Sequence, residues 1–303
     1  MENLFSNQPL LIPIVIIHKD EPEALDAMLT SIRENTNYPH QIFIVDNASK
    51  LAEARDYLRK LSSHQEYNLI LNKSNNWVLG FNLVFKHSRW PKGCSLMVFS
   101  DCDIVVPALS ENELCWLSYL KQQMDTYVCI GKLGLSLMVD DLDESELNQK
   151  IIKREARFDK NPTIGTNTIC GVDTTLAIYR NDFFMMENFK FLIGHASVAK
   201  PHYYTCRVSR KYQAKHLGWY KKLDALSMRY LQEKILCFAK YAAYIEPEVL
   251  SAASWRYRCY FKIVSSLAKF FWSARILMIV FLYYLKCFPR AMNPLQNAAK
   301  YEQ

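Results

Sequence analysis

Two aspartates separated by one residue, Asp101 and Asp103, have the clearest chemical potential in this sequence. They follow an apolar run, and at a strand end residues i and i+2 can aim their side chains at one point. Two converging carboxylates repel each other unless a cation lies between them. Oxygen ligands suit a hard divalent ion, Mg²⁺ or Mn²⁺, and such an ion pairs naturally with a diphosphate. Taken alone, the triplet also fits a strand that ends in an acidic turn.

Apolar runs of strand length alternate with helical patterns over the first hundred residues. The predicted strands are 10–17, 41–45, 67–72 and 95–100, and the predicted helices are 23–35, 51–61 and 78–88. The strand runs lack polar alternation, which is typical of parallel strands buried on both faces. The alternation of strands and helices predicts an α/β fold with a doubly wound, mostly parallel sheet flanked by helices.

Aspartates recur where these predicted strands end. Asp20 follows the first strand, Asp46 the second, and Asp101 and Asp103 the fourth. Ligands of such sheets bind at the carboxyl ends of the strands. We therefore expect these four side chains to lie along one rim of the sheet.

Three of these segments together resemble family 2 glycosyltransferases of the GT-A fold. They are 14–21, 42–49, which contains Val-Asp-Asn-Ala-Ser, and 99–103, which contains Asp-Cys-Asp. The resemblance covers roughly residues 10–185. It implies a GT-A-like sheet and a nucleotide site at its carboxyl edge.

The resemblance also implies roles for single residues. By it, His18 lines the pocket of the nucleotide base and Asp46 accepts a base N–H. Asp101 lies on the ribose or metal side, and Asp103 is a metal ligand. For Asp46 alone, an Asx-turn is the simpler alternative.

The segment 168–180 resembles the family's glycine-led strand that ends in an arginine beneath the acceptor. An acid within it could take a proton from an acceptor hydroxyl, and Asp173 is the candidate general base. The alternative is that Asp173 caps the backbone or pairs with a basic neighbour. Many relatives carry a later Glu-Asp pair as the base, and no such pair follows this segment here.

A late histidine completes the metal shell in several GT-A enzymes, and His216 is the candidate in this sequence. Neutral imidazole is a good third ligand for Mn²⁺, although a lone histidine is more often structural. Three basic residues could meet diphosphate oxygens, namely Lys215, Arg207 and Arg210. The acidic run 140–146 lacks the spacing of a calcium loop, so we expect a solvated helix start there.

The C-terminal part of the chain is basic and aromatic. The net charge is +7, and residues 221–303 carry 13 Lys/Arg against five Asp/Glu. Residues 276–285 are ten consecutive apolar or aromatic residues, whereas a spanning helix needs about 20. Arg275 inside such a span would cost about 2.5–3.5 kcal/mol. We therefore expect a monotopic helix on an anionic membrane surface rather than a nucleic-acid partner, with a true span or a buried or dimer helix as alternatives.

Chain length and cysteine content limit the domain organisation and the cellular compartment that we expect. The 303 residues suffice for a glycosyltransferase domain over 1–220 and a helical membrane-anchoring region over 221–303. Nine cysteines without a Cys-x-x-Cys pair fit a reducing cytosol. The apolar N-terminal run has no basic segment before it, so a secretory signal is not expected. These features predict the cytoplasmic face of the cell membrane.

The resulting hypothesis is a metal-dependent, inverting glycosyltransferase of bacterial surface-polysaccharide type. It would move a sugar from a nucleotide-diphosphate donor to a hydroxyl of a glycan or lipid-linked oligosaccharide. A nucleotidyltransferase is the first alternative, but it needs a glycine-rich basic loop after the first strand, and residues 18–22 contain no glycine. A noncatalytic, membrane-bound nucleotide-sugar-binding module is the second alternative.

Overall fold

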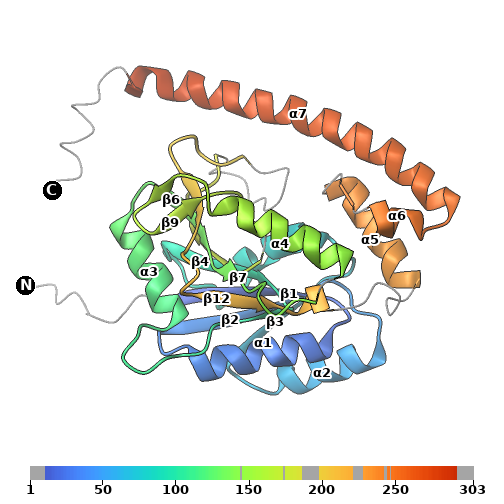
Figure 1. Cartoon of the computed structure of the whole chain (residues 1–303), viewed down its shortest axis with the longest axis horizontal. Helices are drawn as coiled ribbons and strands as arrows, with labels where there is room; N and C mark the ends of the chain where they lie inside the picture. Colours follow the sequence, from blue (N-terminus) through green and yellow to red (C-terminus); the bar gives the residue numbers. More distant parts are fainter. Residues whose placement is uncertain are drawn as a thin grey trace, which may run out of the picture. The chain divides into compact units, whose positions relative to one another are not determined.

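The computed structural model describes residues 11–143, 145–172, 175–185, 198–220, 228–241, 244–245 and 247–291. The chain forms two compact units, which are treated separately (Figure 1). The described part of the first unit comprises residues 11–183, with the gaps stated above, and 201–220. The second unit contains residues 184–200 and the chain from 228 onward.

The first unit is an α/β structure with a nine-stranded sheet and a three-stranded sheet. The strands are β1 (Ile12–His18), β2 (His40–Asp46), β3 (Tyr67–Leu71), β4 (Leu96–Asp101), β5 (Ile104–Val105), β6 (Ile130–Gly134), β7 (Ser136–Leu137), β8 (Thr163–Ile164), β9 (Asn167–Ile169), β10 (Ala177–Arg180), β11 (Tyr204–Arg207) and β12 (Gln213–His216). The helices are α1 (Pro22–Asn35), α2 (Ala52–Ser62), η1 (Trp77–Lys86), α3 (Trp116–Thr126), α4 (Glu146–Phe158) and η2 (Leu217–Tyr220).

The large sheet has the strand order β3-β2-β1-β4-β10-β6-β11-β9-β8. Strands β1 to β4 are parallel to one another, which confirms the predicted α/β class and the doubly wound N-terminal half. Beyond β4 the sheet is mixed, because β10 runs antiparallel to both β4 and β6. The description "mostly parallel" therefore applies to the first four strands.

Both faces of β1 are buried, as its unbroken apolar sequence predicts. Ile14 and Ile16 point to the face that α1 and α2 cover, and they share one core cluster with Leu25. These two helices lie side by side along that face (Figure 1). On the other face, Phe43 contacts the ring of Trp90 at a centroid distance of 5.3 Å. Side chains that alternate along a strand fill both layers in this way.

The third predicted helix, 78–88, is the 3₁₀-helix η1 over Trp77–Lys86. Its sequence is rich in β-branched and aromatic residues and has no side-chain N-cap, which weakens a regular α-helix. Gly80 lies close to the ends of β2 and β3. A Cβ atom at this position would come within 2.5 Å of Asn47 Oδ1 and 2.9 Å of Asn72 Nδ2. Glycine therefore allows the close approach of η1 to the strand ends.

The small sheet has the order β5-β12-β7. Strand β12 is antiparallel to β5, with His216 opposite Ile104, and parallel to β7, with Ala214 opposite Leu137. The start of β5, the end of β12 and the segment that follows β7 consequently lie at the same end of this sheet. Sequence periodicity did not predict this pairing, because each strand is only two to four residues long.

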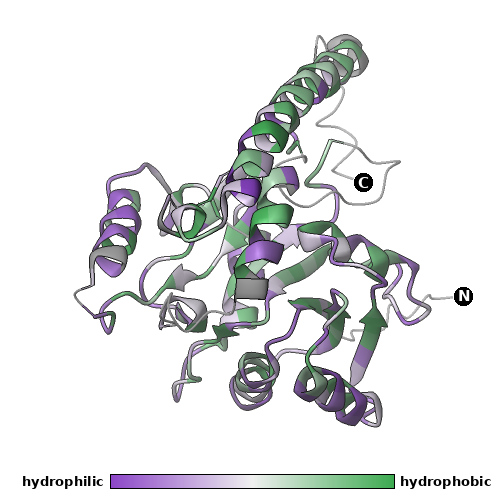
Figure 2. Ribbon diagram, turned by 90° about the vertical axis from the view of Figure 1, so that its right-hand side faces the viewer, coloured by the Kyte–Doolittle hydropathy of each residue, from purple (hydrophilic) through white to green (hydrophobic). Residues whose placement is uncertain are grey.

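The second unit contains α5 (Met228–Tyr241), α6 (Pro247–Ser251) and α7 (Trp255–Ala291). Helix α5 packs against α7. Helix α7 is continuous over 37 residues, which is about 55 Å at 1.5 Å per residue. Figure 2 shows this long helix largely in the colour of hydrophobic residues. The division of the chain at residue 220 stays a prediction.

We predict that Gly80→Ala lowers the free energy of unfolding by about 1–3 kcal/mol. The new methyl group would meet the amide of Asn47, which is 3 % exposed and hydrogen-bonded on both sides, so this amide has little room to move. Urea unfolding measures the change. Gly171→Ala is the matched control, because a Cβ there meets no atom within 4 Å. Equal stability of both variants would contradict the close packing of η1.

Candidate functional site

The carboxyl ends of the parallel strands form one rim of the large sheet. In the register of the sheet, His18 at the end of β1 lies opposite Asp46 at the end of β2. Asp101 at the end of β4 lies opposite Ile17 on the other side of β1. The strand order reverses between β1 and β4, and a ligand crevice forms at such a switch point. The structure thus places three of the sequence-predicted site residues on the expected rim.

His18 and Asp46 form a buried hydrogen-bonded pair, with 3.0 Å between His18 Nδ1 and Asp46 Oδ1. His18 is 1 % exposed and Asp46 is 5 % exposed. The backbone N–H of Glu21 donates to His18 Nε2 over 3.3 Å. Since Nε2 accepts a hydrogen bond, Nδ1 carries the ring proton and donates it to Asp46.

Ser49 completes the surroundings of Asp46. Its backbone N–H donates to Asp46 Oδ2 over 2.9 Å, and its hydroxyl donates to Oδ1. Burial by itself would raise the pKa of Asp46, but the bonds from His18 and Ser49 outweigh it and hold the pKa below the usual value of 3.8. Asp46 is therefore a buried anion that joins β1 to the turn after β2. Its contact with a nucleotide base stays a prediction.

Asp20, the first aspartate of the predicted rim, serves the start of α2. Its Oδ1 accepts hydrogen bonds from the backbone N–H groups of Lys50, at 2.5 Å, and Leu51, at 2.8 Å. Lys19 Nζ lies 2.6 Å from Asp20 Oδ2. The N-cap residue of α2 makes no side-chain cap, so Asp20 supplies acceptors for the unpaired donors there. Its carboxylate is thus used within the protein.

Amide side chains extend this network to β3 and η1. Asn72 Nδ2 donates to Asn47 Oδ1 over 2.7 Å, and Asn47 Nδ2 donates to the carbonyl of Trp77 over 3.0 Å. Three residues of this rim have left-handed backbone angles that non-glycine residues seldom adopt, with φ of 55° at Asp20, 60° at Ala48 and 51° at Trp77. Strained backbone that the surroundings hold in place is common at functional sites. Sequence reasoning missed Asn47 and Ser49, although both belong to the Val-Asp-Asn-Ala-Ser run.

The Asp-Cys-Asp triplet spans the end of a strand and a turn. Strand β4 ends at Asp101, and Asp103 belongs to the turn that precedes β5. The two aspartates therefore do not both lie on a strand, as the i, i+2 argument had assumed. They do flank one buried thiol: burial, and then the charges of Glu21, Asp103 and Asp101, raise the pKa of Cys102 well above its usual value of 9.0. The triplet is thus a concentration of negative charge at the rim.

Asp103 and His216 lie together at the end of the small sheet, with 3.4 Å between Asp103 Oδ2 and His216 Nδ1. The backbone N–H of Gly218 donates to the same Nδ1 over 3.2 Å, so this nitrogen is an acceptor. The ring of Trp219 stacks on the imidazole at a centroid distance of 4.9 Å and an interplanar angle of 9°. An acceptor nitrogen thus faces a carboxylate oxygen, which is the arrangement that a shared cation stabilises.

Three observations test this pair as part of a metal site. Asp103 Oδ1 is buried and has no hydrogen-bond partner among the described residues. Gly218 provides room for the pair, since a Cβ there would come within 2.5 Å of Asp103 Oδ2. Within the described ranges, no group of three or more His, Cys, Asp or Glu side chains could hold a metal ion. Asp103 and His216 therefore fit as two ligands of Mg²⁺ or Mn²⁺, and the ligand shell requires Asp101, diphosphate or water in addition.

The basic side chains expected near a diphosphate are engaged elsewhere. Lys215 Nζ lies 2.7 Å from Asp141 Oδ2. Arg207 forms a buried ion pair with Glu155 of α4. Burial and this pairing remove Arg207 from the groups that can meet a diphosphate, so that expectation is wrong. The predicted helix start at 140–146 agrees with the structure, because α4 begins at Glu146. Asp141 is not merely solvated, however, since it pairs with Lys215.

The candidate base Asp173 lies outside the described residues, and its role stays a prediction. The backbone just before it is anchored, because Lys132 Nζ donates to the carbonyl of Val172 over 2.6 Å. Arg180, the arginine that ends the segment 168–180, donates through Nε to the carbonyl of Ile130 over 2.8 Å. This arginine thus joins β10 to the start of β6.

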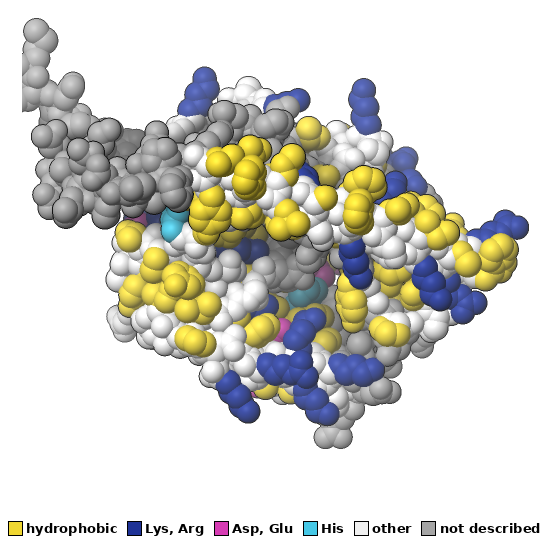
Figure 3. Space-filling model, turned by 90° about the horizontal axis from the view of Figure 1, so that it is seen from above, with side chains coloured by type: hydrophobic (Ala, Val, Ile, Leu, Met, Phe, Trp, Pro, Cys, Tyr) yellow, Lys and Arg dark blue, Asp and Glu magenta, His cyan; other side chains and the backbone are white. Residues whose placement is uncertain are grey.

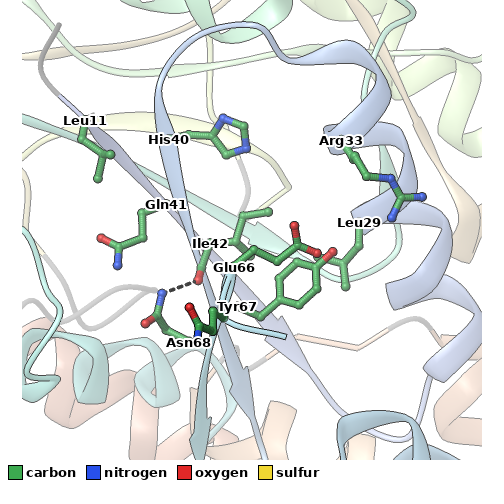
Figure 4. Close-up of a pocket in the computed structure, with 10 residues that line it drawn as sticks. Leu11, Leu29, Arg33, His40, Gln41, Ile42, Glu66, Tyr67 and Asn68 are labelled. Atoms are coloured by element: carbon green, nitrogen blue, oxygen red, sulfur yellow. Dashed lines mark hydrogen bonds between the residues drawn. The ribbon is translucent and has the colours of Figure 1, made fainter. Parts of the chain in front are cut away.

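A cavity of about 550 Å³ lies at the opposite edge of the sheet, beside the first residues of β2 and β3 (Figure 4). Its lining residues are Leu11, Leu29, Arg33, His40, Gln41, Ile42, Gln65, Glu66, Tyr67 and Asn68. None of the sequence-predicted site residues borders it. Ligands of parallel sheets bind at the carboxyl edge, so this cavity is not the candidate active site.

We predict that Asp46→Asn lowers the free energy of unfolding by about 1–3 kcal/mol at neutral pH. The pKa of Asp46 in the folded protein lies below 3.8. Its contribution is therefore complete above the pKa of the unfolded chain, and it is lost as the pH falls through the folded pKa. Urea unfolding from about pH 7 to pH 3 should show the difference between wild type and variant shrinking towards the acid end. Asp56→Asn, on the exposed side of α2, is the control, and a pH-independent difference for Asp46→Asn would contradict the assignment.

Comparisons with known proteins agree with this geometry. Residues 14–110 match the family model for glycosyl transferase family 2. A comparison with curated proteins gave no match. The fold is similar to that of the mannosyltransferase PcManGT from Pyrobaculum calidifontis, solved in complex with GDP-Man and Mn²⁺, with 14 % identity, coverage of 97 % of this chain and 84 % of that chain, and a TM-score of 0.50.

Two other solved structures are less similar. TarS 1–349 of S. aureus in complex with UDP has 11 % identity, with 82 % of this chain and 68 % of that chain covered and a TM-score of 0.44. GalNAc-T7 with UDP, GalNAc and Mn²⁺ has 11 % identity, with 77 % and 51 % covered and a TM-score of 0.47. The family match over residues 14–110 contains β1 to β4 with Asp46, Asp101 and Asp103. The family match is thus confined to residues 14–110, and the fold of the chain is GT-A-like.

Proposed function

We propose that this enzyme transfers a sugar from a nucleotide-diphosphate donor to a hydroxyl group of a glycan or lipid-linked oligosaccharide, with inversion at the anomeric carbon. The observation that carries the proposal is the convergence of Asp103 and His216, 3.4 Å apart, next to the strand-order reversal of a family 2 glycosyltransferase domain. PcManGT, whose fold is similar, was solved with GDP-Man and Mn²⁺. A surface-polysaccharide acceptor of a bacterial cell is the acceptor class that we propose.

In this proposal the nucleotide binds where β1, β2 and β4 end. His18 and Asp46 are buried and mutually bonded, so they shape the floor of a base pocket. Since the protein uses three acceptor positions of Asp46, one carboxylate lone pair is left for a base N–H. We assign Asp101, at the end of β4, to the ribose or metal side.

Asp103 and His216 would hold a divalent cation, Mn²⁺ or Mg²⁺, together with oxygens of the diphosphate or water, and Asp101 would lie close to this site. When bound, this ion neutralises the charge that develops on the departing diphosphate. The chain's own contribution is to hold one carboxylate oxygen and one imidazole nitrogen in place without a competing hydrogen bond to Asp103 Oδ1 within the described residues. The stacked ring of Trp219 fixes the plane of the imidazole.

On the acceptor side, we assign the proton transfer to Asp173. The acceptor oxygen forms a bond to the anomeric carbon as the bond to the diphosphate oxygen breaks. The hydroxyl proton passes to the Asp173 carboxylate, and the electron pair of the broken bond leaves with the diphosphate. A single displacement of this kind inverts the anomeric configuration.

We predict that Asp103→Ala weakens Mn²⁺-dependent binding of UDP or GDP by roughly 10- to 100-fold. The variant removes a metal ligand, whereas the local fold depends on the backbone pairing of β4 with β1 and of β5 with β12. Isothermal titration with Mn²⁺ and with EDTA measures the effect, and Asp103→Asn keeps the side-chain size as a second variant. Asp56→Ala, an exposed carboxylate on α2, should bind like wild type. Unchanged Mn²⁺-dependent affinity in both Asp103 variants would overturn the metal site.

We also propose that α7 associates with an anionic membrane surface at the cytoplasmic face of the cell. Over Trp255–Leu285 this helix is long and apolar enough to cross a membrane by length and composition alone, and an 18-residue window within it has a mean hydropathy of 1.6. Its exposed apolar side chains include Leu277 at 70 %, Phe270 at 69 % and Phe281 at 62 %. Figure 3 shows hydrophobic side chains exposed along this helix. Such exposure is unfavourable in water and favourable at a lipid surface.

The expectation that the apolar run is too short to span needs a correction, since the helix is continuous over 37 residues. Length therefore does not separate a helix that spans from one that lies in the interface. Basic residues are interleaved with aromatic ones from Trp255 to Lys262, which favours the interface. Arg275 near the middle would cost about 2.5–3.5 kcal/mol in a span. We therefore propose the orientation in the plane of the membrane.

We predict that Leu277→Asp lowers binding of the full-length protein to phosphatidylserine-containing vesicles by about tenfold or more, because a buried leucine contributes about 1.5–3 kcal/mol. Vesicle flotation measures the bound fraction. Leu71→Asp is the matched control, since Leu71 is 65 % exposed but belongs to β3. Salt should weaken wild-type binding, since each surface Lys or Arg adds about 1 kcal/mol. Resistance to carbonate extraction would favour a membrane-spanning helix. If the wild-type protein does not bind such vesicles, the proposal of membrane association is wrong.

A further inference from the structure

The segment that carries His216 is held in place from outside the metal site. His216 ends β12, and η2 follows directly over Leu217–Tyr220. At one point the backbone is tied to the site itself, because Leu217 N–H donates to the carbonyl of Asp103 over 2.8 Å. A second set of contacts reaches this segment from the loop after β7, through Asp141.

Asp141 binds the residues on both sides of His216. Its Oδ2 lies 2.7 Å from Lys215 Nζ, and its Oδ1 accepts a hydrogen bond from the hydroxyl of Tyr220. The Lys215 ammonium also lies over the Tyr220 ring, 4.3 Å from its centroid. One carboxylate therefore closes the segment 215–220 into a loop with His216 inside it.

Backbone pairing brings Asp141 to this position. Strand β7 runs parallel to β12, and the N–H of Met138 donates to the carbonyl of Ala214 over 2.9 Å. The chain beyond β7 consequently continues alongside the end of β12. The preceding residue, Asp140, lies 4.0 Å from Arg210, and within the described part of the chain it forms no ion pair with the segment 215–220. The two neighbouring aspartates thus differ in the one contact that matters here.

We propose that Asp141 is a positioning residue, which holds the segment 215–220 so that His216 faces Asp103 before a metal ion or diphosphate arrives. This inference rests on the proposed function of that pair. A site that is assembled only part of the time binds its ligand more weakly by the fraction assembled. Loss of the Asp141 contacts therefore weakens binding without removing any ligand of the metal.

The first test needs no ligand. Hydrogen exchange of the peptide that covers residues 213–220 should become roughly two- to fivefold faster in Asp141→Asn, the range expected for an exposed charged contact. Tyr220→Phe, which removes only the hydroxyl donor, should change exchange in the same direction by a smaller factor. Asp140→Asn is the matched control and should exchange like wild type, and Asp141→Glu should restore slow exchange. Wild-type exchange in both Asp141→Asn and Tyr220→Phe would overturn the proposal.

The second test measures Mn²⁺ affinity in the presence of UDP or GDP by titration calorimetry. We expect Asp141→Asn to bind Mn²⁺ roughly two- to fivefold more weakly, with an unchanged melting temperature and with recovery in Asp141→Glu. Faster exchange together with unchanged Mn²⁺ affinity would overturn the positioning role. A wild-type protein that binds neither nucleotide with Mn²⁺ would instead overturn the proposed function, and hydrogen exchange alone would then decide whether Asp141 holds the segment.

Discussion

The pairing of β12 between β5 and β7 is the constraint on which the candidate site depends. These short strands place the turn after β4, the end of β12 and the loop after β7 at one end of a small sheet. Backbone hydrogen bonds fix the main chain there, so Asp103 and His216 meet although they are far apart in the sequence. The side chains add the remaining precision through the stacked ring of Trp219 and the contacts of Asp141.

The rim of the large sheet is held mainly by side-chain hydrogen bonds to a buried carboxylate. There the protein buries a carboxylate, Asp46, and satisfies it with His18 and Ser49. A buried charge is tolerated only when hydrogen bonds replace its water, so the turn after β2 is tightly specified. The amides of Asn47 and Asn72 are hydrogen-bonded to each other and lie next to Gly80, so they extend this network to η1. In our proposal, this rigid floor lets a nucleotide bind without reorganisation of the strands.

Helix α7 presents the opposite case, because its apolar side chains remain exposed. Phe261 and Ile279 on this helix are buried, with 8 % and 7 % of their surface exposed. In contrast, Leu277 and Phe281 are not covered by any of the described residues to a comparable extent. A soluble protein seldom exposes so much contiguous apolar surface. This excess is what makes a lipid surface the natural partner in our proposal for the second unit.

The sequence by itself determined the parallel half of the large sheet, since unbroken apolar runs and intervening amphipathic helices leave few other arrangements for β1 to β4. It also marked Asp46, Asp101 and Asp103, because local runs that end strands are visible without coordinates. Only the tertiary structure decided that Arg207 is buried against Glu155, that Asp20 serves α2, and that Asp141 reaches Lys215 and Tyr220. The physical reason is that each of these contacts joins segments that are distant in the chain, and the contacts of Asp141 also depend on the pairing of two short strands, β7 and β12. Such strands have too few residues to show a period, so their pairing is set by the packing of the whole unit rather than by local sequence.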